Sequence, residues 1–185
     1  DVFYALLYGK FNFEESQNNI DLEYPAKFIT LSTTKDKLAV YTINGEIRIY
    51  STLTDFALLK IIKTGYIQSM EFINDSQILF TNIAGDLLMI DILSGKYHFY
   101  TESVLNNKYK DLFKIPGNEN SWIATSQNGG VDLLNYQKKD GFFKVKEKKG
   151  ARIQAMTIEN DQIAWAEKNN FFISGLFEDD KELLF

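Results

Sequence analysis

Residues that could carry acid–base, nucleophilic or metal chemistry are few in this chain and lie far apart. The 185-residue sequence has no cysteine and a single histidine, His98, which excludes a thiolate metal site and a histidine pair. No serine or carboxylate stands at a recognisable motif spacing from His98. We therefore predict that His98 faces solvent on a strand, with proton transfer or ligation as the alternative.

The acidic and glycine-rich stretches also lack what a reaction would need. Asp179-Asp180 has no surroundings that would give its two carboxylates different roles, so the stretch from Glu178 to Glu182 reads as a solvated loop or a site for a basic peptide. Gln127-Asn128-Gly129-Gly130 lacks the Lys and Ser/Thr of a phosphate loop and is predicted to be a hairpin turn. The sequence thus predicts no catalytic residue, no metal ligand, no cofactor and no enzyme activity.

Positive charge is concentrated in one stretch, the Lys138–Lys149 cluster. Its members are Lys138, Lys139, Lys144, Lys146, Lys148 and Lys149. Such a cluster could hold the phosphates of RNA or of a phosphoinositide. Lysines that alternate along an outer strand also block edge-to-edge pairing, and we favour this structural interpretation. The net charge of −5 runs opposite to the basic balance of most nucleic-acid-binding domains.

Composition narrows the class and the compartment. Apolar residues make up 45% and charged residues 24%, as in a globular domain, and 15 Phe with 10 Tyr favour strands. No apolar run approaches the ~20 residues that span a bilayer. The absence of cysteine suits a reducing interior, so we expect an intracellular protein of the cytoplasm or nucleus.

An internal repeat is the main structural signal. Turns centred on Asn44-Gly45, Ala84-Gly85, Asn128-Gly129 and Asn169-Asn170 follow one another at steps of 40, 44 and 40 residues. A second marker follows at 40, 45 and 40 residues, through Leu38, Ile78, Ile123 and Ile163. Repeats of this length are typical of solenoids, propellers and arrays.

Each unit predicts four short strands. In one unit they cover Ile67–Phe72, Ile78–Phe80, Leu87–Ile90 and Tyr97–Thr101, separated by polar or glycine turns. Four strands per ~40 residues is the spacing of a β-propeller blade. The sequence therefore predicts an all-β fold of about four blades.

The apolar pattern supports the same fold. Leu38-Ala39-Val40-Tyr41 is solidly apolar, as expected of an inner strand covered on both faces. Phe143-Lys144-Val145-Lys146 alternates, as expected of a half-exposed outer strand. Trp122 and Trp165 are predicted to lie in the core.

The units resemble the WD40 repeat family over roughly residues 27 to 177. The stretch from Leu31 to Val40 is similar to the first half of a WD40 repeat. Asn44-Gly45-Glu46-Ile47-Arg48-Ile49-Tyr50 resembles the segment D-G-x-I-R-I-W. Gly85 to Asp91 is similar, and Ile92-Leu93-Ser94-Gly95-Lys96 resembles L-x-T-G-K.

The units also depart from that family. None carries the Gly-His dipeptide, so the hydrogen-bonded His–Asp tetrad of the family cannot form in the usual way. Tyr50-Ser51, Ile90-Asp91 and Leu134-Asn135 stand at the Trp-Asp position. The chain therefore resembles a degenerate WD40 propeller.

The repeat divides the chain into predicted parts. The blades cover 27–66, 67–107, 108–150 and 151–185, and the last could be incomplete. Residues 1–26, with the apolar run Val2–Tyr8, could supply strands of a preceding blade or a closing segment. Because four blades are at the low end for propellers, we favour a part of a larger propeller of about six to eight blades. The remaining blades would lie outside this chain; the alternative is closure of the four units with the leading segment.

The resemblance implies that partners bind where the second-to-third-strand turns and the links into each first strand meet. The candidate partner-binding residues are Thr42, Asn44, Tyr66, Gln68, Asn82, Lys149, Arg152, Lys168 and Asn169. Tyr66 and Arg152 head this set because Tyr and Arg are favoured interface hot spots.

We expect the chain to be a non-catalytic scaffold, a WD40-like subunit of a multiprotein complex that binds other protein subunits. Two alternatives stay open. One is RNA or phosphoinositide binding through the Lys138–Lys149 cluster, and the other is a small-ligand or enzymatic role of a central channel.

Overall fold

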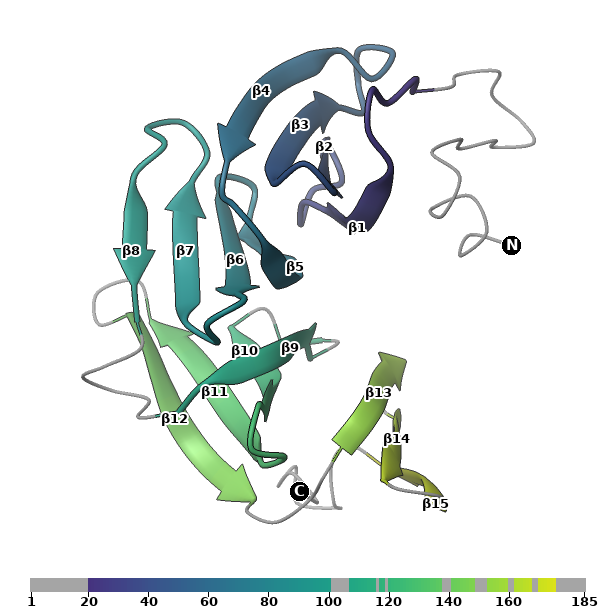
Figure 1. Ribbon diagram of the computed structural model, residues 1–185, viewed down its shortest axis with the longest axis vertical. Helices are drawn as coiled ribbons and strands as arrows, with labels where there is room; N and C mark the ends of the chain where they lie inside the picture. Colours follow the sequence, from purple (N-terminus) through teal and green to yellow (C-terminus); the bar gives the residue numbers. More distant parts are fainter. Residues whose placement is uncertain are drawn as a thin grey trace. The chain divides into compact units, whose positions relative to one another are not determined.

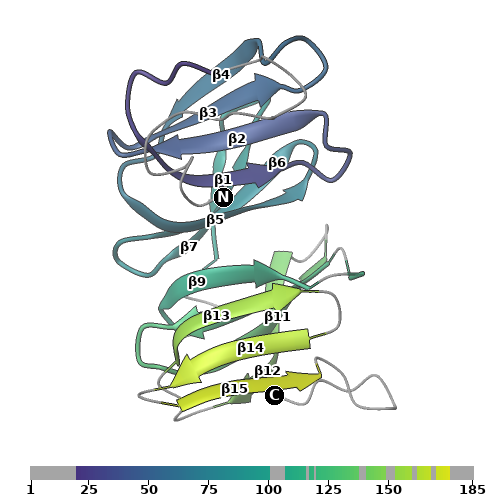
Figure 2. The same ribbon diagram turned by 90° about the vertical axis from the view of Figure 1, so that its right-hand side faces the viewer.

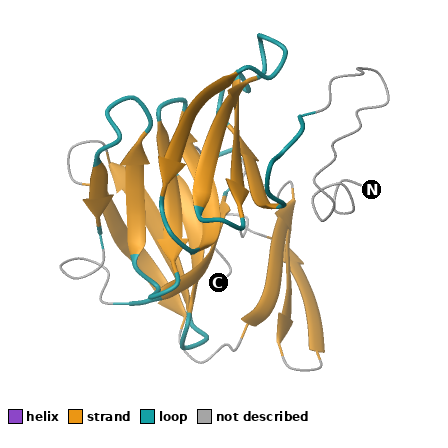
Figure 3. Ribbon diagram, turned by 45° about the horizontal axis from the view of Figure 1, so that its top comes forward, coloured by secondary structure: helices purple, strands orange, loops and turns teal. Residues whose placement is uncertain are grey.

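The computed structural model describes residues 20–100, 107–115, 117–118, 120–137, 141–148, 153–159, 162–167 and 170–175. Every regular element within these ranges is a β-strand, and Figure 1 and Figure 3 show them as arrows. The strands form four antiparallel sheets, and within each sheet neighbours in the chain are neighbours in space. The predicted all-β fold of propeller blades is thereby confirmed.

Two compact units make up the chain. The first unit consists of the residues up to Ile83 together with Met89–His98. The second consists of Ala84–Leu88 and the residues from Phe99 on. The second sheet therefore contributes to both units. The predicted blade boundaries stay predictions.

The first sheet belongs wholly to the first unit. Its strands are β1 (Ala26–Leu31), β2 (Lys37–Thr42), β3 (Glu46–Ser51) and β4 (Leu58–Lys63). Every residue of β2 and β3 after the first is buried, as the solid apolar sequence of β2 predicts. β4 exposes most of its residues, as an outer strand should.

One face of the first sheet is covered by the segment that precedes it. Leu38, Val40 and Tyr50 form a buried cluster, and Ile20 and Leu22 pack against it. This face therefore obtains its cover locally, from residues that directly precede β1.

The second sheet repeats the same order. Its strands are β5 (Ile67–Asn74), β6 (Gln77–Asn82), β7 (Leu87–Asp91) and β8 (Tyr97–Phe99). β8 has only three residues and all are exposed, including His98. The outer strand thus ends earlier than the predicted Thr101.

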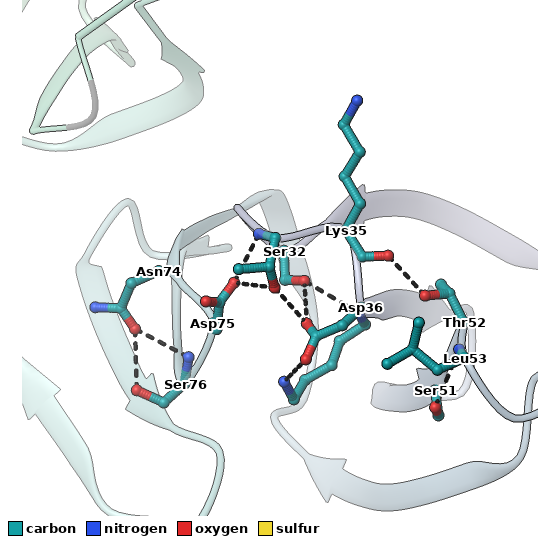
Figure 4. A network of polar contacts seen from close by, with 11 residues as sticks. Ser32, Lys35, Asp36, Ser51, Thr52, Leu53, Asn74, Asp75 and Ser76 are labelled. Atoms are coloured by element: carbon teal, nitrogen blue, oxygen red, sulfur yellow. Dashed lines mark hydrogen bonds and ion pairs between the residues drawn. The ribbon is translucent and has the colours of Figure 1, made fainter.

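Within the first unit, β1 lies beside β5 and polar side chains join the two sheets. Thr30 donates its hydroxyl to Glu71 at 3.0 Å. At the β1–β2 turn, the Thr34 amide and hydroxyl both donate to Asp75, at 2.9 Å each (Figure 4). Asp75 of the β5–β6 turn thus connects neighbouring blades.

The third sheet belongs to the second unit. Its strands are β9 (Tyr109–Lys114), β10 (Ser121–Ser126), β11 (Val131–Gln137) and β12 (Gly141–Lys148). All of β10 is buried, and Trp122 lies in the core as predicted. Its ring meets Phe142 edge-on at 5.2 Å between centroids.

The fourth sheet has three strands within the described residues, and Figure 2 shows them side by side in yellow-green. They are β13 (Ile153–Glu159), β14 (Gln162–Glu167) and β15 (Asn170–Gly175). Ile163 packs in a core cluster with Ile123 and Val131 of the third sheet. Trp165 is only partly buried, but it packs against the same cluster.

Candidate interaction surface at the blade turns

The same backbone hydrogen bond anchors a turn in each of the first three sheets. The amide just after the second strand donates to the carbonyl of the residue just before the first strand. These bonds join Ile43 to Pro25 (3.1 Å), Ile83 to Tyr66 (3.3 Å) and Gln127 to Lys108 (2.8 Å). The turn after each second strand therefore lies beside the segment that enters the first strand of the same sheet.

The link between β4 and β5 also hydrogen bonds to the β2–β3 turn of the first sheet. The carbonyl of Gly45 accepts from the amides of Thr64 at 3.0 Å and Gly65 at 3.2 Å. Gly65 has φ of +71°, a left-handed conformation that glycine adopts without steric cost. The residue that follows, Tyr66, is thus carried on a link with fixed backbone.

Three large side chains are exposed around this link. Tyr66 is 69% exposed, Ile43 of the β2–β3 turn is 51% exposed and Ile83 of the β6–β7 turn is 71% exposed. The two turns flank the link, through Gly45 on one side and the Ile83 amide on the other. We call Ile43, Tyr66 and Ile83 the turn surface.

The predicted neighbours of Tyr66 divide into exposed and buried residues. Asn44 is exposed on the β2–β3 turn. Thr42 is buried, and its hydroxyl bonds to the Asn44 side chain at 2.5 Å and the Glu46 carbonyl at 3.2 Å. A partner could reach Tyr66 and Asn44 without touching Thr42, whose hydroxyl shapes the turn.

Gln68 and Asn82 lie together at the same end of the second sheet. The Gln68 amide nitrogen donates to the Asn82 carbonyl at 2.7 Å, and both residues are partly exposed. Gln68 is two residues after Tyr66 in the chain, and Asn82 directly precedes Ile83. The five predicted residues between 42 and 82 therefore gather at one end of the first unit.

The other predicted contact residues lie outside the described residues and stay predictions. They are Lys149, Arg152, Lys168 and Asn169. The same is true of Lys138 and Lys139 of the basic cluster and of the acidic stretch from Glu178 to Glu182.

Charge at the start of β3, directly after the β2–β3 turn, is matched locally. Glu46 has a lowered pKa, first because the Asn44 side chain hydrogen bonds to it and also because Arg48 does. The buried Arg48 reaches Glu46 at 3.2 Å and Glu23 at 3.0 Å. Burial opposes the positive charge of Arg48, but the bonds to Glu23 and Glu46 outweigh it and raise the pKa of Arg48. The charges at the start of β3 are thus ion-paired with one another and with Glu23.

The corresponding turn of the second unit is polar. Lys108, Gln127 and Asn128 are exposed there. The Lys108 ammonium donates to the Ala84 carbonyl at 3.0 Å and lies 3.6 Å from Asp86. The same turn geometry therefore carries a hydrophilic surface in this unit.

A buried carboxylate stands out inside the second unit. Asp132 of β11 accepts from the Tyr109 hydroxyl at 2.6 Å and from the Asn107 amide at 3.1 Å. The Lys144 ammonium lies 3.9 Å away, and the second oxygen of Asp132 has no hydrogen-bond partner among the described residues. Sequence reasoning missed this residue, because a single Asp in an apolar strand carries no motif.

The described part of the chain does not assemble a group of side chains for metal binding. No set of three or more His, Asp or Glu residues comes together there to hold a metal ion. None of the described residues forms a helix long and apolar enough to cross a membrane. The described turns of the first unit present exposed apolar side chains.

Ile43 and Ile83 were missed as surface residues. An isoleucine directly after an apolar strand is ordinarily interpreted as the last residue of that strand. Whether its side chain is exposed depends on the residue at which the turn begins. The available signal was position: both stand two residues before the turn glycine, where the third blade has Gln127.

Comparison with known proteins concerns the fold. No family model matches the chain. No curated protein matches it in sequence. Among solved structures, the β-propeller domain of Cps50 (Swd1) from Myceliophteria thermophila is similar, with a TM-score of 0.60 at 8% sequence identity. The match covers 75% of this chain and 47% of that chain, so this chain is similar to less than half of that β-propeller domain.

Proposed function

We propose that this chain is a non-catalytic, WD40-like scaffold that binds another protein subunit through the turn surface. The observation that carries the proposal is the exposure of Ile43, Tyr66 and Ile83 on turns held by backbone hydrogen bonds. Single exposed apolar residues are ordinary, whereas adjoining ones mark interaction sites. Tyrosine is also among the residue types that dominate binding energy at interfaces.

The rigid backbone supports the same function. A partner that binds a held loop does not have to order it, so less free energy is lost on association. The ion pairs of Arg48 with Glu46 and Glu23 match the charge at the start of β3, directly after the β2–β3 turn. Binding through this surface should therefore depend on shape and burial more than on salt concentration.

Further blades and an intracellular setting belong to the same proposal. The match to less than half of a β-propeller domain supports blades outside this chain that complete the propeller. The lack of cysteine supports a reducing compartment, the cytoplasm or nucleus. The degenerate repeats support a role in an assembly rather than in a reaction.

Phosphate binding by the Lys138–Lys149 cluster gains no support from Lys144. Its ammonium lies near the buried carboxylate of Asp132 and is directed to the protein's own charge. We therefore keep the turn surface as the proposed site.

The test is recovery of a partner by the tagged chain and by two variants. Tyr66→Ala should lower recovery of a stoichiometric partner by about tenfold or more, the usual effect of removing a hot spot. Leu53→Ala is the matched control, because Leu53 is 77% exposed in the β3–β4 turn. That turn lies beside the β1–β2 turn, through the bond from the Thr52 hydroxyl to the Lys35 carbonyl (Figure 4), and so it is separate from the β2–β3 turn. Both variants should unfold at the wild-type temperature.

Two results would sink the proposal. One is a chain that remains a monomer with no partner under all conditions tried. The other is a Tyr66→Ala variant that recovers its partner as well as the Leu53→Ala control does.

A further inference from the structure

One buried side chain holds the peptide groups on both sides of Tyr66. Tyr41 lies on β2 and is 1% exposed. Its hydroxyl donates to the Gly65 carbonyl at 3.2 Å and accepts from the Ile67 amide at 3.3 Å. A single phenol therefore bridges the residues before and after the exposed ring.

The position of Tyr41 in the repeat makes this contact specific to the first blade. Tyr41 stands four residues before the turn glycine, and Thr81 and Thr125 hold the same position in the second and third blades. All three are buried. The Thr125 hydroxyl bonds to Asp111 within its own sheet, at 3.0 Å to the carboxylate and 3.1 Å to the amide. Only in the first of these three blades does a phenol, long enough to reach the link to the next blade, occupy the position.

The ring and the hydroxyl of Tyr41 have separable roles. The ring stacks on Phe28 at 5.8 Å between centroids, with 25° between the planes, and so fills the core. Within the described residues, the hydroxyl hydrogen bonds to the Gly65 carbonyl and the Ile67 amide of the link. Tyr41→Phe therefore removes the bridge and keeps the packing.

We infer that Tyr41 is the positioning residue of the turn surface, because its hydroxyl holds the link so that Tyr66 is presented in one arrangement before a partner arrives. The inference rests on the proposed function, and it makes affinity depend on a side chain that no partner touches. A link that samples several arrangements binds more weakly, in proportion to the fraction of molecules that are competent.

Hydrogen exchange tests the bridge directly. In Tyr41→Phe the Ile67 amide loses its acceptor, and its exchange should become about tenfold faster or more. The Ile43 amide, which bonds to Pro25, is the internal reference and should keep its rate. Phe28→Leu is the matched control, because it weakens the same ring stack and leaves the hydroxyl in place.

A synthetic binder tests the consequence for recognition. The probe is a monobody selected on the wild-type chain and rejected by Tyr66→Ala. Tyr41→Phe should bind it about three- to tenfold more weakly, the loss expected for one or two hydrogen bonds, mainly through slower association. Phe28→Leu should bind it as the wild type does.

A second variant disturbs the link from the solvent side. A side chain added at Gly65 would meet no atom within 4 Å, but the φ of +71° disfavours alanine. Gly65→Ala should therefore weaken the monobody and speed exchange at Ile67 without risk to the core, even if Tyr41→Phe did not fold.

The inference is overturned if Tyr41→Phe keeps wild-type exchange at Ile67, or if exchange rises while the monobody affinity is unchanged. Wild-type behaviour of Gly65→Ala in both measurements would overturn it as well. Failure of the proposed function would give a different result. The Tyr66→Ala variant would then recover the natural partner as well as the wild type does, independently of the result for Tyr41→Phe.

Discussion

The two units of the chain share one turn geometry and present opposite chemistry on it. In the first unit the amide of Ile83 bonds to the Tyr66 carbonyl, and in the second the amide of Gln127 bonds to the Lys108 carbonyl. Both bonds join backbone atoms, so they place no demand on the side chains. One unit exposes isoleucine and tyrosine there, and the other exposes lysine and glutamine. A repeated backbone thus leaves its turn positions free to diverge.

Buried charge shows a second contrast between the units. Arg48 and Asp132 both stand three residues after the turn glycine, in the third strand of their sheets. Arg48 is paired with the carboxylates of Glu23 and Glu46. Asp132 obtains most of its partners from neutral groups, the Tyr109 hydroxyl and the Asn107 amide. The same strand position accepts either sign of charge when local partners are supplied.

The largest expected effect compares glycines of the two units. A side chain at Gly85 would come within 2.7 Å of the Lys108 Cβ and 2.9 Å of the Gln127 Cδ, whereas Gly65 has open space. Both have positive φ. Gly65→Ala should lower the free energy of unfolding by about 1–2 kcal/mol, the left-handed backbone cost alone. Gly85→Ala should cost about 3 kcal/mol or more, because steric overlap is added. Urea unfolding measures both, and equal losses would contradict the close packing at Gly85.

The next effect concerns the buried carboxylate of the second unit. Asp132→Ala should lower the free energy of unfolding by about 1–3 kcal/mol, because the Tyr109 hydroxyl loses its acceptor. The double variant with Tyr109→Phe should cost less than the sum of the single variants, by about 1 kcal/mol. Exposed Asp21→Ala is the control and should stay within about 0.5 kcal/mol of wild type. Strict additivity in the double-mutant cycle would show that the two groups do not interact.

A smaller effect is expected on the pH dependence of stability in the first unit, at Asp36. The ammonium of Lys37, with the hydroxyls of Ser32 and Thr34, lowers the pKa of Asp36 from 3.8 to about 2 (Figure 4). A lowered folded-state pKa means that this contribution to stability is complete above about pH 4 and is lost as pH falls through about 2. The melting-temperature difference between wild type and Asp36→Asn should therefore be constant above about pH 5 and shrink between about pH 4 and 2. A difference that does not change with pH would remove the ion-pair explanation.

The smallest expected effect is the change in the free energy of unfolding when residues of the turn surface are substituted. Ile43→Ser and Ile83→Ser should each change the free energy of unfolding by no more than about 0.5 kcal/mol, because both side chains are already exposed. Gln127→Ser of the second unit should be equally silent. A large loss at either isoleucine would mean that it supports the fold, and it would weaken the contrast between the two units.

Much of the fold could be predicted from the sequence because the repeat and the apolar alternation are local signals. The run Leu38-Ala39-Val40-Tyr41 of β2 is solidly apolar and buried, and a glycine-centred turn follows the strand. Trp122 was rightly assigned to the core. Trp165 was also assigned to the core, but it is only partly buried. An apolar pattern identifies the face of a strand that packs inward and not how much of that face is covered.

The candidate site was predicted less completely. Tyr66 was chosen from its place before a first strand, and it is exposed. Thr42 was chosen from its place at a second-to-third-strand turn, yet it is buried and its hydroxyl bonds to Asn44. Ile43 and Ile83 were not chosen at all, since an apolar residue at a strand end is ordinarily read as core.

By itself, the sequence determined the strand content, the four-unit repeat and the positions of the turns, because each depends on residues a few places apart. Only the tertiary structure decided which turn side chains face solvent, which hydroxyl meets the Asp132 carboxylate and which phenol holds the Tyr66 link. The Tyr41 hydroxyl and the Gly65 carbonyl are 24 residues apart in the chain. Their meeting depends on how one sheet packs on the next, and no local pattern of residue types encodes that packing.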